Sequence, residues 1–149
     1  MEIIALANDH RGYETKVKLL EFLREIGFMP LDVGTHSPDR CDAQDYAVAL
    51  AQVMGEGKAK KGIAICGSGN MIAMAANRFP HIRAAVCPHV TAARMCRLHN
   101  DANVISMGSD FMGYDLIREC VEAFLNTEFL GGRYASRVEK LTNLDPRNL

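Results

Sequence analysis

Residues 61–78 read KGIAICGSGNMIAMAANR. The run Gly62–Ile65 is short, apolar and bounded by turn signals, which is typical of a buried strand. A plausible helix follows over 69–77, and small and polar residues join the two segments. This stretch therefore predicts a strand, a tight loop and a helix, which together form the first part of a β-α-β unit.

The same pattern recurs on both sides of this stretch. Four further apolar runs predict strands at Ile3–Ala7, Met29–Val33, Ala84–Cys87 and Val104–Met107. One helix is predicted by Tyr13, Val17, Leu20, Leu23 and Ile26, which recur every three or four residues before Gly27. Others are predicted over 44–56, 89–98, 112–126 and 133–143. This alternation predicts an α/β fold with a five-stranded parallel sheet.

Composition limits the possible classes of protein. The 149 residues, 48% of them hydrophobic, fit a single domain over 1–149. Seventeen Lys and Arg against eighteen Asp and Glu give a formal net charge of -1, so we expect no nucleic-acid or membrane partner. The first strand has no basic leader, and five cysteines without a CxxC spacing argue against a disulfide framework or a zinc site. We expect a reducing compartment, the cytoplasm.

The loop Cys66–Asn70 carries the strongest chemical signal. Gly67 and Gly69 would let backbone N–H groups approach a phosphate or a developing enediolate oxygen. A thiol at a helix start favours the reactive thiolate form, although an inert buried cysteine fits the spacing of Cys66 equally well. No Gly-Lys-Ser/Thr follows, and Ile72 occupies the position of a cysteine phosphatase's arginine, which disfavours phosphoryl transfer.

Three other segments carry candidate residues, each with a simpler alternative. Asp9 and His10 follow the first strand, where Asp9 could also be a helix cap. His99 and Asn100 precede the fifth strand in a segment that could be a surface turn. Arg133 and Arg137 share one helix face and could bind a phosphate, or could simply be solvated. The polar segment Thr35–Gln44 could be a mobile loop over a pocket.

Taken together, these motifs resemble the type B ribose-5-phosphate isomerases and the related galactose-6-phosphate isomerases. The resemblance is carried by Asp9-His10, Cys66–Gly69 with Ile72–Arg78, Ile82–Ala84, His99–Val104, and Gly131–Arg133 with Arg137. It implies a Rossmann-like three-layer sandwich and no metal or organic cofactor. It also implies a homodimer, in some members paired into a tetramer, in which the C-terminal helix reaches the partner and the active sites are shared.

The resemblance also assigns roles to residues. Cys66 would move the proton through a cis-enediolate, which the backbone of Gly67, Gly69 and Asn70 would stabilise, and Ser68 would move hydroxyl protons. Asp9 and His99 would assist opening of the sugar ring. Substrate would further be held by Asn100 at a hydroxyl and by His10, Arg133 and Arg137 at the phosphate.

Departures from the family pattern leave the substrate open. Met71 and Ala73 replace a glycine and a small polar residue, and Ala43 removes an aromatic wall of the pocket. Asp110 stands where relatives often have a phosphate-binding arginine, and it would repel a dianion unless it points away or pairs with an arginine. Three hypotheses remain: isomerisation of ribose-5-phosphate, the same chemistry on another aldose phosphate or free sugar, such as a tetrose, allose or galactose type, and a non-catalytic sugar-phosphate-binding module.

Overall fold

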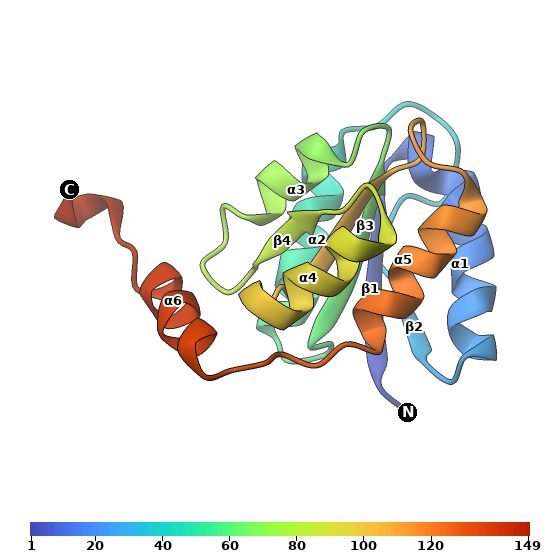
Figure 1. The fold of residues 1–149 in the computed structure, drawn as a ribbon. Helices are drawn as coiled ribbons and strands as arrows, with labels where there is room; N and C mark the ends of the chain where they lie inside the picture. Colours follow the sequence, from blue (N-terminus) through green and yellow to red (C-terminus); the bar gives the residue numbers. More distant parts are fainter.

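The structure, a computed structural model, describes residues 1–149 and contains one five-stranded parallel sheet (Figure 1). The strands are β1 (Ile3–Asn8), β2 (Met29–Asp32), β3 (Lys61–Cys66), β4 (Ala84–Val86) and β5 (Val104–Gly108). Their order across the sheet is β2-β1-β3-β5-β4, and every neighbouring pair is parallel. All five predicted strands are confirmed.

Six α-helices and two short 3-10 turns complete the chain. The helices are α1 (Tyr13–Glu25), α2 (Ala43–Gly55), α3 (Asn70–Ala76), α4 (Val90–Asn100), α5 (Tyr114–Leu125) and α6 (Arg133–Thr142), and the 3-10 turns are η1 (His10–Gly12) and η2 (Pro146–Asn148). Every predicted helix is present, with its ends shifted by no more than two residues. No helix is long and apolar enough to span a membrane.

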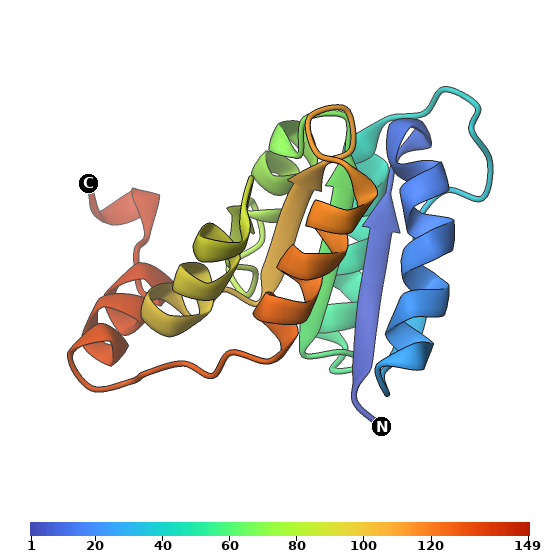
Figure 2. The ribbon, with the colours of Figure 1, turned by 45° about the vertical axis from the view of Figure 1, so that its right-hand side comes forward.

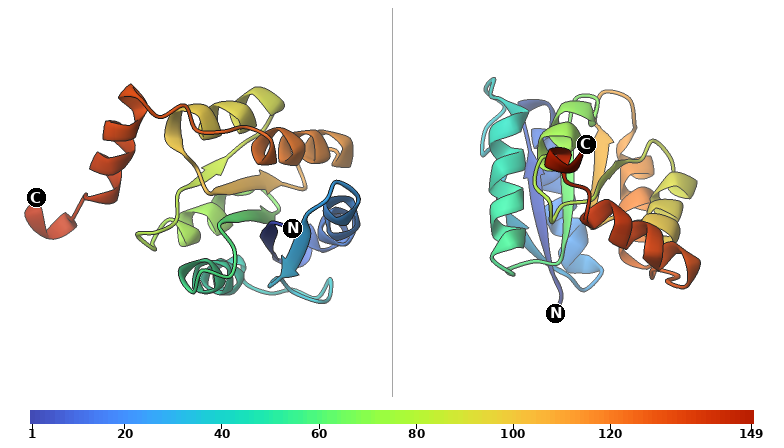
Figure 3. Two further views of the ribbon diagram at one scale, coloured as in Figure 1. Left: turned by 90° about the horizontal axis from the view of Figure 1, so that it is seen from below. Right: turned by 90° about the vertical axis from the view of Figure 1, so that its left-hand side faces the viewer.

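The two faces of the sheet carry side chains of different size. In β3, Ile63 and Ile65 pack with α1, α4 and α5, whereas Ala64 and Cys66 pack with α2 and α3. Because side chains alternate along a strand, this pattern separates a bulky face from a small one. Figure 3 shows one layer of helices on each side of the sheet, which confirms the Rossmann-like three-layer sandwich. The Cys66 side chain thus lies on the α2 and α3 face, where small residues leave room beside it.

The strand order creates a switch point beside β3. The chain passes from β1 outward to β2 and then returns to β3 on the other side of β1. Loops at the carboxyl ends of β1 and β3 therefore leave in opposite directions and open a crevice, the usual ligand position in such sheets. Figure 2 shows all the visible strand arrows pointing to the same end of the molecule.

Helix α6 stands apart from the rest of the fold. None of its residues is buried, and Figures 1 and 2 show it projecting from the body near the amino ends of the strands. It contacts the body through α4, where the His99 and Tyr134 rings stack with centroids 4.3 Å apart. The position of α6 is thus held by few interactions within the chain.

Candidate active site

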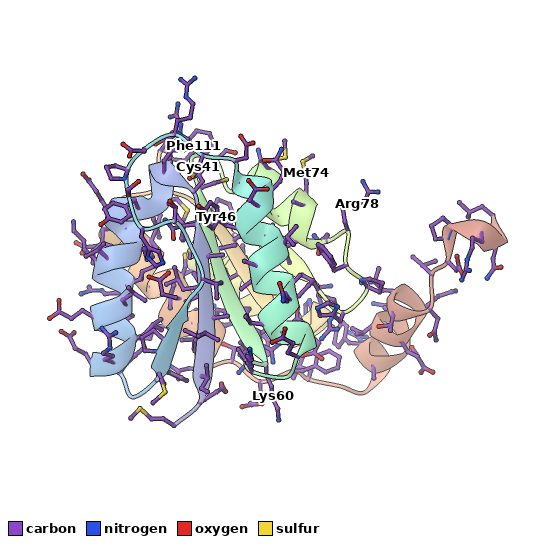
Figure 4. All side chains as sticks on the ribbon, turned by 180° about the vertical axis from the view of Figure 1, so that it is seen from behind. Cys41, Tyr46, Lys60, Met74, Arg78 and Phe111 are labelled. Atoms are coloured by element: carbon purple, nitrogen blue, oxygen red, sulfur yellow. The ribbon has the colours of Figure 1, made fainter.

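An open cavity of about 410 Å³ lies at the carboxyl ends of the strands, beside the switch point. Its walls come from the loops after β1, β3 and β5 and from the segment that leads into α2. The lining residues are Asp9, Arg11, Cys41, Asp42, Ala43, Gln44, Cys66, Gly67, Ser68, Met71, Asp110 and Phe111. We call it the Cys66 cavity. Figure 4 shows Cys41 and Phe111 together at this end of the molecule.

Cys66 lies at the floor of this cavity. Its side chain is almost fully buried, yet it forms part of the cavity wall, so the thiol is not sealed inside the core. The backbone N–H of Gly69 donates a hydrogen bond to Sγ over 3.1 Å. The backbone of the loop thus contacts the sulfur directly. The sulfur therefore borders the cavity and accepts a backbone hydrogen bond, and its role as a base stays a prediction.

The loop around Cys66 is fixed by the end of β5. Gly69 adopts φ +80°, and a Cβ there would lie 2.8 Å from the Met107 carbonyl carbon, so glycine is required. The Ser106 hydroxyl donates to the Gly69 carbonyl oxygen over 2.7 Å, and the Ser109 N–H donates to the Cys66 carbonyl oxygen over 2.9 Å. These contacts hold the loop before any ligand arrives.

Two N–H groups of the loop are free to bind an anion. Those of Gly67 and Ser68 donate to no acceptor in the chain, while that of Asn70 donates to Ser68 Oγ over 3.1 Å. Because the Ser68 oxygen accepts this bond, its hydroxyl proton remains available to another partner. The loop therefore offers backbone donors and a mobile proton next to the thiol.

Asp9 has two roles in this structure. Its Oδ1 accepts hydrogen bonds from the N–H groups of Arg11, at 2.9 Å, and Gly12, at 3.2 Å, which is the geometry of a cap on η1. The same carboxylate forms part of the cavity wall. Capping and ligand contact, which the sequence left as alternatives, are therefore compatible.

Three predicted substrate-binding residues near this cavity, His10, Gly69 and Asn70, lie outside its wall. His10 Nδ1 accepts a hydrogen bond from the Cys41 backbone N–H over 3.3 Å, which ties η1 to the segment before α2. Asn70 is exposed at the first position of α3. The segment predicted as a loop over a pocket does border the cavity, through Cys41, Asp42 and Gln44.

The other predicted site residues gather around a second cavity, of about 240 Å³. It is lined by His99, Asn100, Tyr134, Arg137, Val138 and Leu141, and we call it the His99 cavity. Arg133 lies one residue before Tyr134 and donates to its hydroxyl oxygen over 3.0 Å. This hydrogen bond raises the pKa of Arg133. The side chains of Arg133 and Arg137 are exposed and have no carboxylate partner.

The two cavities lie at opposite ends of the strands. Cys66 ends β3 beside Gly108, whereas His99 and Asn100 precede β5, which starts beside Gly62. The five residues of β5 separate these two ends by about 16 Å at roughly 3.3 Å per residue. Within one chain, the structure does not bring His99, Arg133 and Arg137 next to Cys66.

Sequence reasoning missed two lining residues of the Cys66 cavity, Arg11 and Phe111. Arg11 Nη1 lies 2.6 Å from Asp110 Oδ2, so Asp110 pairs with an arginine, which was one of the expected resolutions. Phe111, largely exposed, supplies an aromatic ring to a wall that has alanine at position 43. The position of Arg11 directly after Asp9-His10 was a signal that could have identified it.

Fold and site together define a Rossmann-like α/β protein with a thiol and free backbone N–H groups at the carboxyl ends of its strands. The chain belongs to the ribose/galactose isomerase family, whose model matches residues 4–141.

Individual relatives match along nearly the whole chain. Ribose-5-phosphate isomerase B of Escherichia coli is 40% identical over 147 residues, which cover 99% of each protein. D-erythrulose-4-phosphate isomerase of Pectobacterium atrosepticum is 34% identical over 142 residues, 93% of this chain and 91% of that protein. The structure of Clostridium thermocellum ribose-5-phosphate isomerase B superimposes with a TM-score of 0.95 at 39% identity and covers 99% of each chain.

Proposed function

We propose that this protein is an aldose-ketose isomerase that interconverts ribose-5-phosphate and ribulose-5-phosphate. The observation that carries the proposal is the position of the Cys66 thiol at the wall of a cavity. Its sulfur accepts a hydrogen bond from the Gly69 N–H and lies beside two free backbone N–H donors. The similarity to the ribose-5-phosphate isomerases B of Escherichia coli and Clostridium thermocellum supports this choice of substrate.

The chemistry requires one proton to move between neighbouring carbons. In the aldose-to-ketose direction, the Cys66 thiolate takes the proton from C2, so that a C–H bond breaks and an S–H bond forms. The electron pair moves onto the C1 carbonyl oxygen, and the N–H groups of Gly67 and Ser68 stabilise the resulting enediolate. The thiol then returns the proton to C1, while the Ser68 hydroxyl relays the proton between the two oxygens.

The remaining predicted residues handle the ring and the phosphate. Asp9 and His99 assist opening of the sugar ring and orient its hydroxyls, and Asn100 is a further hydroxyl partner. His10, Arg133 and Arg137 bind the phosphate; a guanidinium suits this task because it is planar and always charged. The N–H groups of Gly69 and Asn70, which donate to Cys66 Sγ and Ser68 Oγ, hold the loop that carries the free donors.

These roles require two copies of the chain. Six bonds of about 1.5 Å join C1 to phosphorus in a pentose phosphate, so its extended length cannot exceed about 9 Å. That is shorter than the separation of about 16 Å between the two ends of the strands. We propose a homodimer in which α6 of one copy carries Arg133 and Arg137 to the Cys66 cavity of the other, and pairing of dimers would give a tetramer.

The proposal extends to the domain organisation and the cellular compartment of the protein. A single domain over residues 1–149 fits the one sheet that all five strands form. Five free thiols suit a reducing compartment, and we propose the cytoplasm.

The direct test is conversion of ribose-5-phosphate by purified protein in deuterated water. We expect ribulose-5-phosphate to form with deuterium at C1, because the thiol exchanges its proton with solvent. Cys66→Ser should slow both conversion and exchange by about 10²–10⁴-fold. Absence of conversion by the wild-type protein in either direction would refute the ribose-5-phosphate assignment.

A second candidate keeps the chemistry and changes the sugar. The D-erythrulose-4-phosphate isomerase relative supports a shorter substrate, a tetrose phosphate. Comparing kcat/KM across tetrose, pentose and hexose phosphates and the corresponding free sugars would choose between the candidates. Binding of these sugars without carbon-proton exchange would instead indicate a non-catalytic module.

A further inference from the structure

The ion pair between Arg11 and Asp110 lies directly over the start of the catalytic loop. A Cβ on Gly67 would lie 2.7 Å from Arg11 Cδ and 2.8 Å from Asp110 Oδ2, so both side chains cover this glycine. The two partners are 99 residues apart in the sequence and come from the turns after β1 and β5. The fold therefore brings one guanidinium and one carboxylate to the rim of the Cys66 cavity.

The turns that carry the pair are themselves fixed. The Ser109 hydroxyl donates to the Arg11 carbonyl oxygen over 2.9 Å, and the Asp110 N–H donates to the Gly67 carbonyl oxygen over 3.0 Å. Both backbones are thus tied to the loop that holds Cys66. The position of the guanidinium over Gly67 follows from these contacts together with the ion pair.

Exposure argues against a purely stabilising role for this pair. The Arg11 and Asp110 side chains are 60% and 43% exposed, and ion pairs with such exposure contribute little to folding stability. Their loss should therefore change the fold very little. A role toward a ligand gives a better account of two opposite charges at the mouth of a cavity.

The charges of the cavity wall indicate which ligand group Arg11 would meet. Three carboxylates line the cavity, Asp9, Asp42 and Asp110, and Arg11 is the only Lys or Arg among the lining residues. A phosphate dianion entering this cavity would be repelled unless a cation meets it. Only Nη1 of Arg11 is engaged within the chain, so its other N–H groups can bind phosphate oxygens.

We propose that Arg11 binds the phosphate of the substrate and that Asp110 is a positioning residue that holds the guanidinium over Gly67. This inference rests on the proposed function, because it assumes a phosphorylated substrate in the Cys66 cavity. It adds to the phosphate site a cation that the same chain supplies, whereas Arg133 and Arg137 must arrive from another copy.

The first test compares Arg11→Ala with a matched control, Lys58→Ala. Lys58 pairs with Glu56 at 2.7 Å with exposures of 61% and 41%, nearly those of the Arg11 pair, but it lines neither cavity. We expect Arg11→Ala to raise the KM for ribose-5-phosphate and the inhibition constant of inorganic phosphate about tenfold or more, with kcat within about twofold. The control should leave all three constants and the melting temperature unchanged.

Conservative and exchanged variants then test positioning. Arg11→Lys should recover part of the KM, and Asp110→Asn should raise it by a smaller factor than Arg11→Ala. The double variant Arg11→Asp with Asp110→Arg should have a lower KM than Arg11→Asp alone, because the guanidinium returns to the cavity rim from the other turn. A double variant no better than the single one would overturn the positioning role of Asp110.

The failure of this inference is separable from failure of the proposed function. If the wild-type protein isomerises ribose-5-phosphate while Arg11→Ala keeps the wild-type KM and phosphate inhibition, the role of Arg11 is refuted and the function stands. A fall in kcat at constant KM would also refute phosphate binding by Arg11. If the wild-type protein shows no isomerisation, an unchanged dissociation constant for inorganic phosphate in Arg11→Ala would still overturn the inference.

Discussion

The Cys66 cavity and the His99 cavity differ in how firmly the chain itself builds them. Around Cys66, hydrogen bonds from Gly69, Ser106 and Ser109 fix a loop that is anchored in the core. The His99 cavity rests on α6, which buries no residue and touches the body through α4. One half of the proposed active site is therefore preformed by the fold, while the other half is carried on an exposed helix.

This difference suggests a division of labour. Proton transfer needs a base within hydrogen-bond reach of the reacting carbon, which demands a rigid loop. Phosphate binding by long, charged side chains tolerates a less rigid support, because their attraction acts over a greater distance. Variants of the loop around Cys66 should therefore change kcat or stability, and variants of the phosphate-binding arginines should change KM.

The largest effect is expected from Cys66→Ser. A serine hydroxyl is a far weaker base than a thiolate, so kcat should fall by about 10²–10⁴-fold while the melting temperature changes little. The matched control is Cys41→Ser, because Cys41 lines the same cavity. This variant keeps the backbone N–H that donates a hydrogen bond to His10. Steady-state kinetics of both variants decide the matter, and equal losses would mean that Cys66 is not the base.

The next largest effect is expected from Gly69→Ala. The positive φ and the close approach to Met107 should together lower the free energy of unfolding by about 1–3 kcal/mol and displace the donor to Cys66. The control is Gly27→Ala. Gly27 also has a positive φ, but a Cβ there would meet nothing within 4 Å. Denaturant unfolding and kcat should separate the two variants: both lose stability, and only Gly69→Ala loses turnover.

A moderate effect is expected from Arg133→Ala. Loss of a charge-assisted contact to phosphate should raise KM about tenfold with little change in kcat. Because the side chain is fully exposed, the melting temperature should stay the same. An unchanged KM would indicate a substrate without phosphate, and a lower melting temperature would mean that α6 is more firmly attached than its exposure indicates.

The smallest effect is expected from Tyr134→Phe. The ring can still stack on His99, but Arg133 loses its hydroxyl acceptor. We expect KM to rise by about twofold, since an exposed hydrogen bond contributes little. Steady-state kinetics of Tyr134→Phe and of the wild-type protein measure this change. A large fall in kcat would move Tyr134 into the reacting part of the site.

Local patterns predicted the fold and the half of the site built from neighbouring residues. Apolar runs such as Gly62–Ile65 identified the strands, and the glycines around Cys66 identified the loop. The pairing of Arg11 with Asp110 had no local signal, because it joins residues 99 positions apart through the order of strands β1, β3 and β5. The placement of His99 at the opposite end of the strands from Cys66 likewise depends on the direction in which α4 returns to β5.

The central claim is that each active site joins the Cys66 cavity of one copy to the His99 residues of another. Mixing the separately inactive variants Cys66→Ser and His99→Asn, with exchange of subunits, tests it directly. The mixture should regain about a quarter of the wild-type activity, because half of the dimers are mixed and each of those has one of its two sites intact. A mixture no more active than the two variants measured apart would contradict the account.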